Sequence, residues 1–150
     1  MKVVFVCSGN ICRSPMAAEY FRHRAKSEGL TDCRVASGGT LGIDGAPASS
    51  EAIEAMAEIG LDLSRHRSRA LSAETLSGAD YTIAMEQDHL EYLARRHPEG
   101  DDARMLLRAF EDDARPRPSA HDLPDPMGNP LSFYREQLPL MTRCVDHLIT

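Results

Sequence analysis

The hydrophobic positions of the chain follow two patterns. Short apolar runs such as Val3-Val4-Phe5-Val6 are typical of buried strands, whereas apolar residues spaced three and four apart are typical of helices packed on one face. These patterns predict strands near Lys2–Val6, Cys33–Ala36, Tyr81–Ala84 and Met105–Leu107, and helices near Ser14–Glu28, Ser49–Ile59, Gln87–Arg96 and Leu131–Leu148.

The predicted strands and helices alternate along the chain, an order that is typical of a parallel sheet covered by helices. We therefore expect a single α/β domain over residues 1–150 with three layers, a central four-stranded parallel sheet with helices on both faces. Apolar stripes on the first and last helices are expected to face the core: Ala17, Tyr20 and Phe21, and Leu138, Met141, Val145 and Leu148. Ligands of such sheets bind beyond the carboxyl ends of strands, where the strand order reverses. A central first strand would place Cys7 at that point.

The most informative segment lies where the first strand ends, at Cys7-Ser8-Gly9-Asn10-Ile11-Cys12-Arg13-Ser14-Pro15. Backbone N–H groups and the dipole of a helix N-terminus converge on an anion at such a strand–loop–helix junction. The same field stabilises a thiolate, so Cys7 is a candidate nucleophile. The alternative is a buried, inert thiol with an unrelated surface arginine.

Four residues of this segment carry conformational expectations. Gly9 and Asn10 tolerate the positive φ that a tightly wound loop requires if its amides are to point inward. Ser14 is expected to be the N-cap of the following helix and Pro15 its first residue. Together these features predict a loop that encloses an anion.

The composition of the chain argues against several other classes of protein. A net charge of −6 argues against nucleic acid as a partner. The four cysteines are irregularly spaced, without a Cys-x2-Cys pair, which argues against structural zinc and against a disulfide scaffold. The chain has no signal-like or membrane-spanning apolar stretch, so we expect a soluble cytoplasmic protein with no membrane partner.

A second motif, Asp122-Leu123-Pro124-Asp125-Pro126, completes a pattern that resembles the low-molecular-weight protein tyrosine phosphatases over essentially the whole chain. The resemblance implies that Cys7 attacks phosphorus, that Arg13 binds the phosphoryl oxygens through its planar fork, and that Asp125 protonates the leaving oxygen. It also implies a phosphocysteine intermediate that water hydrolyses with Asp125 as the base. No metal or other cofactor is implied.

The same resemblance assigns roles to the rest of the loop and to residues elsewhere. It identifies the phosphate-binding loop as Ser8, Gly9, Asn10, Ile11, Cys12 and Ser14, in addition to Cys7 and Arg13. Ser14 would donate a hydrogen bond to the thiolate, and Asn10 would hold the loop in shape with support from Ser37 and His66. Cys12 has two interpretations, a partner that protects Cys7 from irreversible oxidation through a disulfide, or a buried packing thiol.

The expected substrate is a phosphorylated protein, with inorganic phosphate as the product. The expected rim of the site is aliphatic and consists of Leu41, Ile43 and Met127. Such a rim buries a phenyl ring but lacks the aromatic pairing, worth about 0.5–1.5 kcal/mol, that many relatives supply after the Asp-Pro pair. Protein arginine phosphatases are similar at this loop but have Thr where this chain has Ile11. Because an apolar side chain there favours a phenyl ring over a guanidinium, phosphotyrosine is preferred and phosphoarginine is the alternative.

Two further classes fit less well. Arsenate reductases share the loop, but their thiol relay needs two further cysteines in the middle of the chain, and none lies between Cys33 and Cys144. An inactive phosphate-binding module would lack the nucleophile, the arginine or the acid, and all three are present. The long stretch Arg108–Asn129 is expected to be a loop that ends in an active-site flap, with Glu111-Asp112-Asp113 as a solvated surface.

Overall fold

The computed structural model describes residues 1–99, 103–117 and 121–150. Its elements, in chain order, are β1 (Lys2–Cys7), α1 (Arg13–Ser27), β2 (Arg34–Gly39), α2 (Ser50–Glu58), α3 (Ala73–Leu76), β3 (Tyr81–Ala84), α4 (Gln87–Arg96), β4 (Arg104–Leu106), the 3₁₀ turn η2 (Leu107–Phe110) and α5 (Leu131–Ile149). Every strand and helix expected from the hydrophobic pattern is present, with ends shifted by a few residues. The largest shift is in β2, which continues through Gly38 and Gly39 to the edge of the Cys7 loop.

The four strands form one parallel sheet with the order β2-β1-β3-β4. Val3 is aligned with Val35 of β2 on one side and with Tyr81 of β3 on the other. Because β1 lies between β2 and β3, the chain builds the sheet outward in both directions from β1. The carboxyl end of β1, with Cys7, is therefore the point at which the strand order reverses, as expected.

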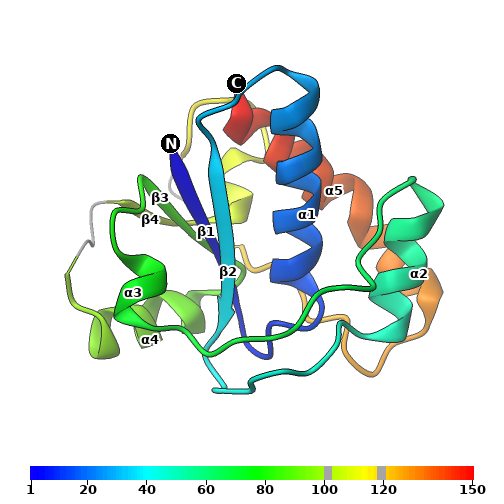
Figure 1. Ribbon diagram of the computed structural model, residues 1–150, viewed down its shortest axis with the longest axis horizontal. Helices are drawn as coiled ribbons and strands as arrows, with labels where there is room; N and C mark the ends of the chain where they lie inside the picture. The colour runs from blue at the N-terminus through cyan, green and yellow to red at the C-terminus, as the bar shows by residue number, and fades with distance from the viewer. Residues whose placement is uncertain (100–102, 118–120) are drawn as a thin grey trace.

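Helices cover both faces of the sheet, which confirms the predicted three-layer architecture. Figure 1 shows α1, α2 and α5 on one face and α3 and α4 on the other. Successive residues of β1 divide between these layers: Val3 and Phe5 pack in the core with α1 and α5, whereas Val4 and Val6 pack in the smaller core beneath α4. Full burial of such a side chain contributes about 1.5–3 kcal/mol.

The expected apolar stripes of the first and last helices face the larger core. Ala17 and Phe21 are buried and Tyr20 is partly buried against it. On α5 the buried residues include all four expected positions, Leu138, Met141, Val145 and Leu148. Among the described residues, no helix is long and apolar enough to cross a membrane.

Two short elements were not expected from the pattern. The single turn α3 has no buried residue and is held by its N-cap, where Ser72 Oγ accepts a hydrogen bond from the Thr75 N–H at 3.1 Å, so it has no hydrophobic period to detect. The turn η2 begins the stretch that was expected to be a loop, and its Leu107 and Phe110 are buried.

The acidic run is only partly solvated. Asp112 is exposed, but the Glu111 carboxylate accepts from Nε and NH2 of Arg108, at 3.2 and 3.1 Å. The expectation of a solvated surface is therefore wrong for Glu111, because η2 brings Arg108 back beside it. Part of the predicted loop, residues 118–120, lies outside the described residues.

Candidate active site

The loop after β1 is held by a fully satisfied asparagine. Asn10 is buried and has φ of 58°, the left-handed conformation expected for it. Its Nδ2 donates to Ser14 Oγ at 2.8 Å and to Ser37 Oγ at 2.9 Å, and its Oδ1 accepts from the Arg69 backbone N–H at 3.0 Å. His66 Nε2 donates to the Asn10 carbonyl at 2.7 Å. The structure thus brings Ser37 and His66 to Asn10.

Glycine is required here at a different position from the one expected. Gly9 does not have a positive φ, so that expectation is wrong; a Cβ there would meet the Ile11 side chain at an ordinary distance of 3.4 Å. Gly39, at the end of β2, is the residue with no room, because a Cβ would lie 2.6 Å from the Ser8 carbonyl oxygen. The two glycines that end β2 were the only sequence indication of this close approach.

Ser14 does not cap the helix, contrary to expectation. α1 begins at Arg13 with Cys12 at the N-cap position and without a side-chain cap. The Ser14 hydroxyl is committed instead to the loop: it accepts from Asn10 Nδ2 and forms a hydrogen bond of 2.9 Å with Cys7 Sγ. Pro15 becomes the third residue of α1, where the N–H that proline lacks would have no helical partner.

Arg13 is a buried guanidinium with one edge held by the protein. Its side chain is 1% exposed, and its NH1 donates to the Leu123 carbonyl at 2.7 Å and pairs with Glu86 Oε2 at 3.0 Å. NH2 lies 3.8 Å from Asp125 Oδ2, and Nε has no hydrogen-bond partner within the described residues. The edge formed by Nε and NH2 is the one suited to two oxygens of a tetrahedral anion.

The Asp-Pro segment is anchored on both sides of Asp125. Leu123 is buried, and its N–H donates to the Met85 carbonyl at 2.8 Å. Asp125 Oδ1 accepts from the Met127 N–H at 3.0 Å, while its other oxygen faces Arg13. The carboxylate is about half exposed, with 47% of its side chain accessible, so it can exchange a proton with solvent.

Two residues that approach the loop were missed by the sequence analysis, Glu86 and His89. His89 is buried; its Nδ1 accepts from the Glu86 N–H at 3.1 Å, so Nε2 carries the hydrogen and lies 2.9 Å from Ser8 Oγ. Burial and the nearby Arg13 charge lower the pKa of His89 to about 4, and the ring is neutral at neutral pH. Both residues follow β3, whose carboxyl end lies beside that of β1 in a parallel sheet. Their position directly after a predicted strand was the feature of the sequence that could have identified them as site residues.

Cys12 is buried at the N-cap position of α1, where two hydroxyl groups approach it. Its Sγ is 3.4 Å from Ser49 Oγ and 3.3 Å from the Tyr134 hydroxyl, two partners that the sequence did not indicate. Burial raises the pKa of the Cys12 thiol. All four cysteines are free, so both interpretations of Cys12 remain predictions.

The three residues of the expected rim are exposed apolar side chains: Leu41 is 66%, Ile43 39% and Met127 50% exposed. The Leu41 N–H donates to the Ser8 carbonyl at 2.9 Å, and Ile43 Cδ1 lies 3.9 Å from the point where a Gly9 Cβ would be. Within residues 1–99, 103–117 and 121–150, no group of His, Cys, Asp and Glu side chains could hold a metal ion.

Comparisons with known proteins agree with this geometry. The family described as low molecular weight phosphotyrosine protein phosphatase matches residues 2–150. A protein-arginine-phosphatase of Geobacillus stearothermophilus is 31% identical over 147 residues, 98% of this chain and 93% of that protein. A probable low molecular weight protein-tyrosine-phosphatase EpsP of Ralstonia nicotianae is 33% identical over 144 residues, 96% of this chain and 90% of its own. A crystal structure of low molecular weight protein tyrosine phosphatase from T. tengcongensis, 38% identical, superposes with a TM-score of 0.89 over 99% of this chain and 97% of that one. The chain therefore belongs to the low molecular weight phosphotyrosine protein phosphatase family.

Proposed function

We propose that this protein removes the phosphoryl group from phosphotyrosine in proteins, through a phosphocysteine intermediate on Cys7. The observation that carries the proposal is the arrangement of Arg13, whose NH1 is fixed by Glu86 and Leu123 while its Nε and NH2 edge lies between the Cys7 loop and Asp125. A phosphoryl group bound to this edge has a nucleophile on one side and a proton donor near the other.

In the first step the Cys7 thiolate attacks phosphorus, and the bond from phosphorus to the tyrosine oxygen breaks. Asp125 transfers its proton to that leaving oxygen, an effect worth about 10²–10⁴ in rate. The Ser14 hydroxyl, 2.9 Å from Cys7 Sγ, stabilises the thiolate before attack. Arg13 and the loop amides stabilise the charge on the equatorial oxygens, which is the main contribution of the protein to phosphoryl transfer.

In the second step a water molecule attacks the phosphocysteine on the side that the tyrosine has left. Asp125, now a carboxylate, accepts a proton from this water as the phosphorus–sulfur bond breaks. Inorganic phosphate leaves and the Cys7 thiolate is regenerated, so one residue acts first as an acid and then as a base. The 47% exposure of the Asp125 side chain lets water reach it.

Phosphotyrosine is preferred because the approach to Cys7 is apolar. Leu41, Ile43 and Met127 are exposed around the loop, and Ile11 is half-buried within it. A phenyl ring buries against these side chains, whereas a guanidinium gains no hydrogen-bond acceptor from them. Phosphoarginine is the second candidate, because the relative from Geobacillus stearothermophilus is a protein-arginine-phosphatase that matches nearly the whole chain.

The test is kcat/KM for a phosphotyrosine peptide and a phosphoarginine peptide of the same sequence, with Cys7→Ser as the blank. We expect preference for phosphotyrosine, and we expect Ile11→Thr to reduce it. The matched control is Ile59→Thr, which changes an exposed isoleucine at the end of α2. Preference for phosphoarginine would overturn the substrate but keep the mechanism; activity in Cys7→Ser would overturn the mechanism.

We further propose that residues 1–150 act as one catalytic domain and that the protein works in the cytoplasm. A catalytic thiol must stay reduced, and the cytoplasm maintains free thiols, whereas oxidising compartments favour disulfides. In the cytoplasm Cys12 would still allow transient oxidation of Cys7 to end in a reversible disulfide. Treatment with hydrogen peroxide followed by a thiol reductant should restore activity to the wild type, and to Cys12→Ser only in part.

A further inference from the structure

A cavity, here called the rear pocket, lies next to the residues that hold Asn10 in the Cys7 loop. Its volume is about 400 Å³, and its walls come from the first half of α1, from β2 and from the segment 62–69. Four arginines and two carboxylates line it: Arg22, Arg65, Arg67 and Arg69, and Glu19 and Asp62. A local excess of positive charge is notable in a chain with a net charge of −6.

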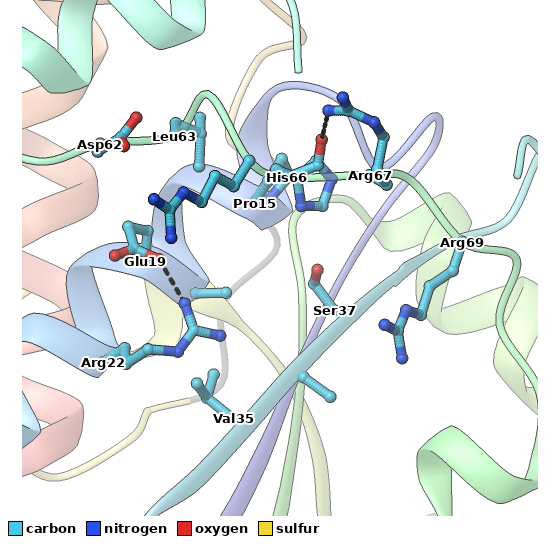
Figure 2. Close-up of a pocket in the computed structure, with 13 residues that line it drawn as sticks. Pro15, Glu19, Arg22, Val35, Ser37, Asp62, Leu63, His66, Arg67 and Arg69 are labelled. Carbon is cyan, nitrogen blue, oxygen red and sulfur yellow. Dashed lines mark hydrogen bonds and ion pairs between the residues drawn. The ribbon is translucent and has the colours of Figure 1, made fainter. Parts of the chain in front are cut away.

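The arginines are not equivalent. Figure 2 shows Arg22 and Arg69 on opposite sides of Ser37, with their guanidinium groups extending toward one another, while Arg67 turns away. Arg67 donates to the His66 carbonyl at 2.8 Å, and Arg22 pairs with Glu19. Within the part of the chain that the structure describes, no hydrogen bond or ion pair involves the Arg69 guanidinium. Arg69 is therefore ready to bind an anion, and Arg22 can share one.

The rear pocket is joined directly to the Cys7 loop. Three of the residues that line it hold Asn10: Ser37 through its hydroxyl at 2.9 Å, His66 through Nε2 at 2.7 Å and Arg69 through its backbone N–H at 3.0 Å. Because Ser37 accepts from Asn10, its own hydrogen remains to be donated. A ligand in this pocket would thus contact the groups that fix the one asparagine on which the loop conformation depends.

His66 reports the charge in the pocket. Burial lowers the pKa of its ring, the hydrogen bond to Asn10 opposes this, and the positive charges of Arg69, Arg67 and Arg22 lower it further. Arg65, Glu19 and Asp62 are the other charged groups that line the cavity. A bound anion would offset the arginines and favour protonation at Nδ1, since Nε2 already carries a hydrogen. The bond from Nε2 to Asn10 would then be charge-assisted and stronger.

We propose that the rear pocket binds a small multivalent phosphate anion between Arg22 and Arg69, and that its binding tightens the hold of His66 on Asn10. Guanidinium forks match phosphate oxygens better than any other common anion-binding side chain. The volume lies in the range of small-molecule sites, about 300–1,000 Å³, so a ligand larger than a single phosphate fits. Pyrophosphate is the simplest probe of this class.

The binding experiment uses titration calorimetry with pyrophosphate at constant ionic strength. The wild type should show two sites, and Arg13→Ala, which removes the anion grip of the active site, should show one. Arg22→Gln with Arg69→Gln should remove one site from the wild type and weaken the site left in Arg13→Ala at least tenfold. The matched control, Arg95→Gln with Arg96→Gln, removes two exposed positive charges from α4 and should change neither.

Either of two results would overturn the proposal: a single site in the wild type, or equal weakening by the pocket variant and its control. The wild-type comparison decides the question even if Arg13→Ala does not fold, because it depends only on the number of sites. A second readout follows the His66 ring by NMR as a function of pH. Pyrophosphate should raise the pKa of His66, and Arg69→Gln should raise it without ligand; no change with pyrophosphate would place the anion elsewhere.

Discussion

His89 should make the stability of this protein fall steeply in acid. Its ring is 2% exposed, and Nδ1 accepts the Glu86 N–H at 3.1 Å, so a second proton cannot be added without losing that bond. The Arg13 charge opposes protonation as well, against the opposite effect of the carboxylates of Asp88, Asp122 and Asp125. The unfolded chain has none of these constraints and takes up the proton at higher pH.

The size of the effect follows from the two pKa values. The pKa of His89 falls from an ordinary value of 6.5 to about 4 on folding. At about 1.4 kcal/mol for each pH unit, the difference is worth about 3 kcal/mol. Because the folded pKa is lowered, this stability is fully present above pH 6.5 and is lost as the pH falls toward 4.

The assay is urea unfolding at several pH values between 7.5 and 4.5 for the wild type and for His89→Gln, which keeps a donor near Ser8 without a titrating ring. Over this interval the free energy of unfolding of the wild type should fall by up to about 3 kcal/mol more than that of the variant. The control is His23→Gln on α1, an exposed histidine whose loss should leave the wild-type curve unchanged. Parallel curves for the wild type and His89→Gln would refute the reasoning.

Three further predictions concern the active site. Ser14→Ala should lower kcat by about tenfold to a hundredfold, since a hydrogen bond to a charged group such as the Cys7 thiolate is worth about 1.5–3 kcal/mol. Asp125→Asn should lower kcat/KM for a phosphotyrosine peptide by about 10²–10⁴, and by much less for an aryl phosphate with an acidic phenol, because kcat/KM covers only the steps up to formation of the phosphocysteine; an equal loss of kcat/KM on both would exclude a role in protonation. Gly39→Ala should destabilise the fold by about 1–3 kcal/mol in urea, because its Cβ would lie 2.6 Å from the Ser8 carbonyl, and unchanged stability would show that the loop can move aside.

The sequence was most informative where one short segment carries both structure and chemistry. The apolar run of β1, the loop and the start of α1 are contiguous, so their order could be predicted from local preferences. Asn10 is the clearest case: a residue that tolerates positive φ was expected in the loop and has φ of 58°. Asp125 could be identified only through the resemblance, because a solvated turn residue in a proline-rich segment looks the same in sequence.

The errors have a common physical cause, which is competition between local preference and partners distant in sequence. Serine is a residue type favoured at the N-cap of a helix, but the Ser14 hydroxyl forms hydrogen bonds with Asn10 and Cys7 instead. Gly39 and His89 lie near the loop because β2 and β3 pair with β1. A contact that depends on strand pairing cannot be predicted from the local sequence pattern. Contacts of this kind are the part of a site that sequence periodicity cannot supply.

Arg13 depends on both local and distant contacts, because the rest of the fold has to compensate for the burial of its charge. Removing a guanidinium from water costs several kcal/mol unless charges and hydrogen bonds replace the water. Here the segment after β3 supplies Glu86 and the Asp-Pro segment supplies the Leu123 carbonyl, so both segments are held against the loop by the group that we propose binds the substrate. Nε remains without a partner among the described residues, and a phosphoryl oxygen would satisfy it. In the proposed mechanism, substrate binding therefore completes a set of contacts that folding leaves incomplete, and Asp125, 3.8 Å from Arg13 NH2, is the carboxylate nearest to that edge of the guanidinium.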